Sequence, residues 1–184
     1  KPMQWLYTLF YTLLAIALAP YVLGLFLPRR FSISQEVVVQ RPVSDVFAFM
    51  RLLKNQERYS TYAQADPNMA IEYRGTDGDV GAVVAWNSND RSVGRSEQEI
   101  KAIKEKERIE LEIRFHEPFQ SVDPLITEFE AIGPNQTRIR NTYCSKIRYP
   151  YNLLVWWVMA KARENMQTSL NNAKALLEKP APQN

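Results

Sequence analysis

The sequence has little sulfur, little histidine and little net charge. Among 184 residues there is one cysteine and one histidine, and the net charge at pH 7 is only +3. Cys144 therefore has no partner for an internal disulfide, and one Cys with one His cannot form a zinc site. The hydrophobic content of 46% and aromatic content of 11% exclude a disordered or collagen-like chain. A single globular domain with its own core is predicted, with no metal and no cofactor.

Charge is entirely missing from the first part of the chain. No charged residue occurs from Pro2 to Pro28, and Trp5 to Leu27 is almost continuously apolar. As a helix this apolar stretch would span about 34 Å at ~1.5 Å per residue, which matches a bilayer core of roughly 30 Å. Residues 1–30 are therefore predicted to form one transmembrane anchor, and Arg29 and Arg30 to contact the membrane surface or a partner.

This stretch allows two other interpretations. A cleaved signal peptide is suggested by the small residues of Ala17-Leu18-Ala19, but the apolar run continues well beyond a signal sequence. A buried core helix would seldom be apolar on every side over this length. Because Arg29, Arg30 and Arg41 follow the span and only Lys1 precedes it, the positive-inside rule predicts a cytoplasmic domain.

The rest of the chain changes from a strand period to a helix period. Alternating apolar residues predict seven strands, at 31–40, 70–74, 81–86, 96–102, 109–115, 125–131 and 139–147. A helix is expected from Pro42 to Leu53, and a second short one within 54–64. From Val155 to Leu177 the apolar residues recur at spacings of three and four, which predicts one long helix.

Short turns between consecutive strands require an antiparallel sheet. The sheet has one apolar face, and the final helix is the only element with a stripe large enough to cover it. The predicted fold class is α+β, with a curved antiparallel sheet of about seven strands gripping a long C-terminal helix. The domain would comprise residues 31–179, and residues 180–184 would be a tail.

This order of elements is similar to the START-like superfamily. The likeness lies in residues 31–49, Gly81-Ala82 leading to Trp86, the FHEPF motif at 115–119 and the final helix. The superfamily includes the Bet v 1 allergens, the lipid-transfer START domains and the bacterial polyketide cyclase/dehydrase-like (SRPBCC) proteins. The chain most resembles bacterial cyclase-like members with an N-terminal membrane segment. Many relatives have tryptophans after the first helix, whereas this chain has LKNQERY at 53–59.

The resemblance implies a helix-grip fold with a cavity between sheet and helix that accepts a hydrophobic molecule such as a lipid, sterol or polyketide. Alternation places several apolar and polar side chains on the inner faces as ligand-binding candidates. They are Trp86, Gln98, Ile113, Phe115, Phe129, Asn141 and Tyr143 on the sheet, with Met159 and Met166 on the helix. The alternative is that they only fill a core, with Gln98 and Asn141 bonded to each other or to buried water.

Catalytic chemistry has weak support in the sequence. Alternation places His116 and Cys144 on outward strand faces, and no Asp or Glu is expected on an inward one. Gly75, Gly78 and Gly81 precede a strand, so they are predicted to be turn glycines and not a phosphate-binding loop. An enzyme is therefore less expected than a binding protein.

The start of the final helix is apolar on every side, and Trp156 and Trp157 are adjacent there. This pattern indicates either a contact with a membrane or partner, or a plug for the open end of the sheet.

The leading hypothesis is a single-pass domain at the bacterial inner membrane that binds, carries or senses a hydrophobic ligand such as a lipid. The alternatives are an accessory subunit docked on a larger membrane complex and, third, a cyclase- or hydrolase-like enzyme. The acidic sheet face opposes nucleic-acid binding.

Overall fold

A computed structural model describes residues 3–90, 93–117 and 120–179. The predicted tail at 180–184 and Pro118-Phe119 of the resemblance motif lie outside these residues. The elements follow in the order α1 (Gln4–Phe26), β1 (Arg30–Val39), α2 (Val43–Met50), η1 (Leu53–Asn55), α3 (Gln56–Tyr59), α4 (Thr61–Ala65), β2 (Ala70–Arg74), β3 (Val83–Asn87), β4 (Arg95–Lys104), β5 (Arg108–Glu117), β6 (Ser121–Gly133), β7 (Gln136–Lys146), η2 (Tyr151–Leu154) and α5 (Val155–Leu177).

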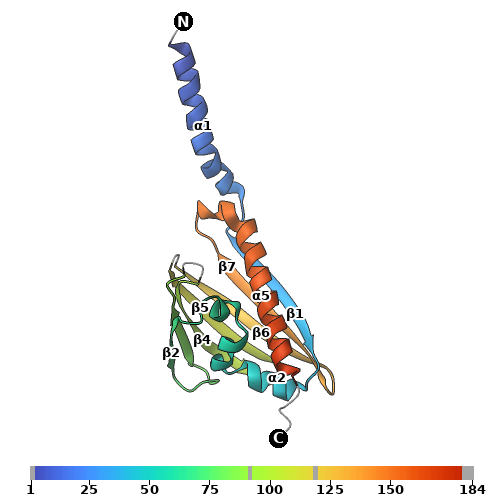
Figure 1. Cartoon of the computed structure of the whole chain (residues 1–184). Helices are drawn as coiled ribbons and strands as arrows, with labels where there is room; N and C mark the ends of the chain where they lie inside the picture. The colour runs from blue at the N-terminus through green and yellow to red at the C-terminus, as the bar shows by residue number, and fades with distance from the viewer. Residues whose placement is uncertain (1–2, 91–92, 118–119, 180–184) are drawn as a thin grey trace.

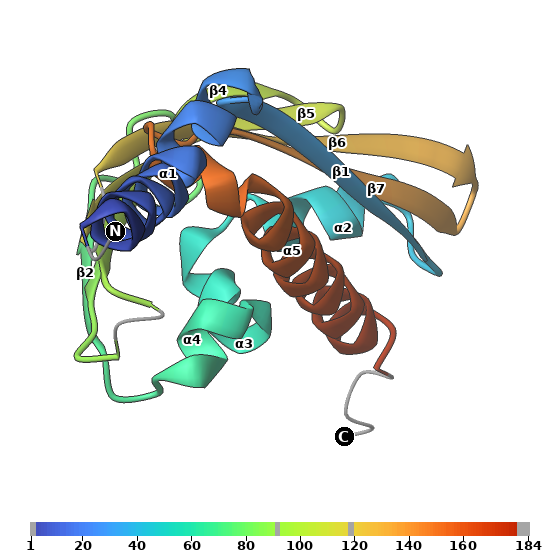
Figure 2. The same ribbon diagram turned by 90° about the horizontal axis from the view of Figure 1, so that it is seen from above.

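The seven strands form one antiparallel sheet in the order β1-β7-β6-β5-β4-β3-β2. The sheet curves over α5, and α2, α3 and α4 lie on the same side of it (Figures 1 and 2). Helix α5 contacts the edge strand β1 much more than the middle of the sheet. The predicted α+β helix-grip fold is thus confirmed.

The main core lies where α2 meets β6 and β7. Val46, Phe47 and Met50 share the buried face of α2, and Phe47 packs edge-on against Phe129 at a ring-centroid distance of 5.3 Å. Leu170 of α5 belongs to the same fully buried cluster. Burial of these side chains closes the end of the grip that is remote from α1.

Strands β4 and β6 depart most from the predicted pattern. In β4 the pairing with β5 shifts register between Ile100 and Ala102, so that Ile103, and not Ala102, joins the core. A bulge adds a residue to one strand and so exchanges the two faces beyond it. Strand β6 begins at Ser121, four residues before the predicted start, and contains Pro124.

Helix α1 projects from the domain and, by length and composition, is apolar enough to cross a membrane (Figure 1). Only its last turns contact the domain. There the buried Asn152 side chain donates from Nδ2 to the carbonyl oxygens of Gly24 (2.6 Å) and Leu27 (3.1 Å), and the Tyr149 hydroxyl donates to the carbonyl of Tyr21. A side chain at Gly24 would press on the Tyr149 ring, with its Cβ at 3.1 Å. These contacts satisfy carbonyl groups at the end of a helix and join α1 to η2.

Candidate ligand-binding face

The concave face of the sheet carries the predicted ligand-binding residues. Phe129 is buried in the core beside Phe47, so it belongs to the closed end of the grip. The other aromatic and aliphatic candidates are only half-buried, although they alternate with outward-facing residues and point toward the helices. They are Trp86, Ile113, Phe115 and Tyr143 on the sheet and Met159 and Met166 on α5. These side chains are therefore less enclosed by protein than Phe129 is.

Two apolar clusters divide the interior. The larger one surrounds α2, and a smaller one near α1 contains Phe31, Ile33 and Val155 with Tyr143 and Met159 packed against it. Met166 packs against both clusters, so this helix residue marks the boundary between them.

Polar side chains without partners lie on the same concave face. Gln98 is 4% exposed, yet its Nε2 has no hydrogen-bond partner among the described residues. The same holds for Ser96 Oγ and for Trp86 Nε1, and register pairs Trp86 with Ser96 across β3 and β4. Buried polar groups are nearly always hydrogen-bonded, so three unpaired groups close together indicate a place for water or for a polar group of a ligand.

Gln98 and Asn141 do not bond to each other. Gln98 is on β4 and Asn141 is on β7, with two strands between them, and Asn141 Oδ1 is also unpaired within the described part of the chain. The alternative of a mutual Gln98–Asn141 bond is therefore wrong. Both residues keep an unused polar atom, as a role in orienting a ligand would require.

A buried carboxylate on the concave face was not foreseen. Asp123 of β6 is 2% exposed, and its Oδ2 accepts hydrogen bonds from the hydroxyls of Tyr143 (2.6 Å), Ser145 (2.8 Å) and Ser121 (3.2 Å). The expectation that no Asp or Glu would face inward is corrected by this cluster. Register places Asp123 beside Ile113, and Ile113 beside Gln98, so the carboxylate and the unpaired amide lie in one row across β4, β5 and β6.

The sequence did contain a signal for Asp123. Leu125, Thr127 and Phe129 alternate inward, and the same period continued backward reaches residue 123. Pro124 obscured it, because proline inside a run argues against a strand.

Tyr143 stays a neutral hydrogen-bond donor at all ordinary pH values. Burial raises the pKa of its phenol far above the usual value, and the neighbouring Asp123 carboxylate raises this pKa further. Tyr62 of α4 also raises this pKa. The Tyr143 hydroxyl therefore stays directed at Asp123.

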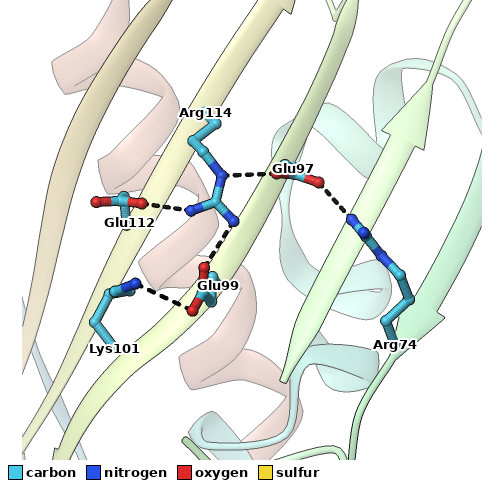
Figure 3. Close-up of polar contacts among 6 residues, drawn as sticks. All are labelled: Arg74, Glu97, Glu99, Lys101, Glu112 and Arg114. Carbon is cyan, nitrogen blue, oxygen red and sulfur yellow. Dashed lines mark hydrogen bonds and ion pairs between the residues drawn. The ribbon is translucent and has the colours of Figure 1, made fainter. Parts of the chain in front are cut away.

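The convex face carries a network of ion pairs. Arg114 lies between Glu97, Glu99 and Glu112, with its guanidinium 2.6 Å from Glu97 and 2.7 Å from Glu99, and Arg74 also pairs with Glu97 (Figure 3). Hydrogen bonds from Arg114 are the main cause that lowers the pKa of Glu97 and of Glu99. Within the described ranges no three His, Cys, Asp or Glu side chains gather as a metal site would require.

Replacing Arg114 with Ala should lower the free energy of unfolding by about 1–2 kcal/mol near pH 7, because three carboxylates then face one another without this cation. The pKa values of Glu97 and Glu99 are lower in the folded state than in the unfolded chain. Their contribution is therefore complete above pH ~5 and is lost as pH falls through the folded pKa values. Urea unfolding from pH 7 to pH 3 should show the free energies of unfolding of wild type and variant converging in acid.

Arg108→Ala, which breaks an exposed ion pair with Glu110, is the control and should change the free energy of unfolding little. Equal losses in both variants would contradict a stabilising role of the ion pairs around Arg114.

The predicted membrane or partner contacts gather where α1 joins the domain. Trp156 and Trp157, in the first turn of α5, are 64% and 63% exposed, so they do not plug the sheet. Arg29 lies over the Tyr149 ring at 5.4 Å, and Arg30 is opposite Lys146 on β7. This end of the molecule thus presents exposed tryptophans and basic residues together.

No family model and no curated protein matches the sequence. Solved structures match its fold. Ara h 8.0201 aligns with a TM-score of 0.58 at 15% identity, over 80% of this chain and 97% of that chain. A Thermus thermophilus protein aligns with a TM-score of 0.60 at 15% identity over the same shares, and the Aha1 dimer of Colwellia psychrerythraea with 0.57 at 14% over 80% and 96%. The fold is therefore the Bet v 1-like, START-like helix grip that the sequence resembles.

Proposed function

We propose that this protein binds a hydrophobic ligand such as a lipid on the concave face, and that α1 holds the domain at the bilayer that supplies it. The observation that carries this proposal is the group of half-buried apolar side chains and unpaired polar atoms on the concave face. There, apolar side chains such as Phe115 and Met159 are half-buried, and Gln98 and Asn141 have unpaired polar atoms. Burying an alkyl chain there would contribute about 0.8 kcal/mol per methylene, so binding needs no chemical step.

The position of α1 supports uptake from a membrane. Asn152 and Tyr149 hold the end of α1 beside η2, so a bilayer around α1 would end next to the first turn of α5. Trp156 and Trp157 are exposed at that level, where tryptophan favours the interface. Arg29 and Arg30 would face anionic headgroups at the same level, each cation contributing ~1 kcal/mol. We also propose a single pass through the bacterial inner membrane, and the basic residues after α1 support a domain on the cytoplasmic side.

The proposal is tested by filling the space with a side chain. Met166 lies between the two apolar clusters, so Met166→Trp should displace the ligand while the domain stays folded. The full chain is purified in mild detergent, and small molecules are extracted and identified by mass spectrometry. We expect wild type to retain an apolar molecule at near one per chain and Met166→Trp to lose most of it. Thr168→Trp, on the exposed side of α5, is the matched control that should retain it.

Other outcomes contradict the proposal. If wild type carries no apolar molecule and a protein co-purifies with it, the domain is an accessory subunit of a membrane complex. If Met166→Trp and Thr168→Trp retain the molecule equally, it is bound elsewhere, for example along α1.

A further inference from the structure

Asp123 stands out by its charge. Among the buried residues of the described strands, it is the only one with a carboxyl or a basic group. It is 2% exposed, and no Lys, Arg or His in the described part of the chain makes an ion pair with it. Burying a carboxylate is unfavourable unless a cation or several donors compensate it. Asp123 is compensated by several hydrogen-bond donors and not by a cation.

The donors all reach one oxygen. The hydroxyls of Ser121, Tyr143 and Ser145 bond to Oδ2, whereas no described group donates to Oδ1. A carboxylate offers about four acceptor positions over its two oxygens, so Oδ2 of Asp123 is held in place while Oδ1 can accept a further donor. The three hydroxyl contacts also prevent the side chain from turning to find another partner.

The surroundings favour an amphiphile. Ile113 lies beside Asp123 in the sheet register, and Phe115, two residues further along β5, is half-buried. Tyr143 belongs to the apolar cluster of Phe31 and Val155, so the carboxylate is at the edge of an apolar region near α1. A ligand that fits here has a hydrocarbon body and one polar end that donates hydrogen bonds.

We propose that Asp123 Oδ1 accepts a hydrogen bond from the ammonium group of an amphiphilic amine, whose hydrocarbon chain lies along the half-buried apolar side chains of the grip. An ammonium supplies both things that the site lacks, a positive charge and an N–H donor to Oδ1, and a charge-assisted bond is stronger than a neutral one. A carboxylic acid would bring a second negative charge and is rejected. This inference rests on the proposed function and specifies the chemical class of its ligand.

Three probes with the same chain and different head groups test it: dodecylamine, 1-dodecanol and dodecanoic acid. Each is titrated into the full-length chain in detergent at pH 7.5, and native mass spectrometry measures the fraction of chain with one probe bound. We expect the amine to bind wild type about tenfold more tightly than the alcohol, and the acid to bind weakest. This comparison needs no variant.

Asp123→Asn then removes the charge and keeps the shape. We expect it to reduce amine affinity to the level of the alcohol and to change alcohol affinity less than about twofold. Glu128→Gln removes a carboxylate from the exposed face of the same strand and should leave the amine preference intact. The inference is overturned if wild type binds amine and alcohol equally, or if Glu128→Gln abolishes the preference as Asp123→Asn does. If wild type binds none of the three probes, the proposed function fails as well.

Discussion

Replacing Phe47 with Ala should lower the free energy of unfolding by about 3–5 kcal/mol, because it removes a large side chain from a core that cannot collapse around the gap. Phe47 is 1% exposed and packs edge-on against Phe129 at 5.3 Å. Chemical denaturation of the full chain in detergent, followed by tryptophan fluorescence, measures the loss.

The matched variant is Phe115→Ala at the other end of the grip. The same atoms are removed, but Phe115 is only half-buried, whereas Phe47 is 1% exposed. We therefore expect less than half of the loss seen for Phe47→Ala, since no new cavity is enclosed. Equal losses for the two variants would show that the grip is solidly packed at both ends, and the proposed ligand space would then not exist.

Replacing Asn152 with Ala should free α1 from the domain. Asn152 is fully buried, and its Nδ2 satisfies the carbonyls of Gly24 and Leu27. Loss of the amide leaves these acceptors without their donor, at a cost of about 1–3 kcal/mol to the junction. The core around α2 is distant from the junction, so the domain should stay folded while the direction of α1 relative to the sheet becomes variable (Figure 1).

Spin labels measure this change directly. With Cys144 replaced by Ser, labels are placed at Thr12 of α1 and at the exposed Glu105 between β4 and β5. We expect a narrow distance distribution for wild type in lipid nanodiscs and a clearly broader one for Asn152→Ala. Asn171→Ala, which removes an exposed amide from α5, should leave the distribution narrow. An unchanged distribution in Asn152→Ala would mean that the amide does not hold the junction.

The sequence alone predicted the architecture because the periodicity of apolar residues is a local property. Ile109, Leu111 and Ile113 alternate with charged residues. Only a strand places the apolar side chains of such a pattern on one face and the charged side chains on the other. The final helix followed from spacings of three and four, and its buried stripe includes the expected Val155, Leu170 and Ala173. Single-sequence patterns of this kind also located the apolar span of α1.

The polar part of the site could be predicted only in part. Gln98 was placed on the concave face by alternation, but whether it would find a partner depended on residues far away in sequence. Asp123 was missed because Pro124 interrupts the pattern locally, while the ladder with β5 and β7 tolerates it. Ile103 replaced Ala102 on the inner face because the register shift in β4 is a property of the strand pair.

The amino-acid order by itself determined which elements form and which faces are apolar, because propensity and periodicity act over neighbouring residues. Only the tertiary structure decided that Ser121, Tyr143 and Ser145 meet at one oxygen of Asp123, and that Asn152 meets the end of α1 across more than a hundred residues. These contacts depend on strand register and on where α5 begins. A hydrogen bond forms where donor and acceptor meet at the right distance and angle in space. The spacing of two residues along the chain does not give that distance or angle.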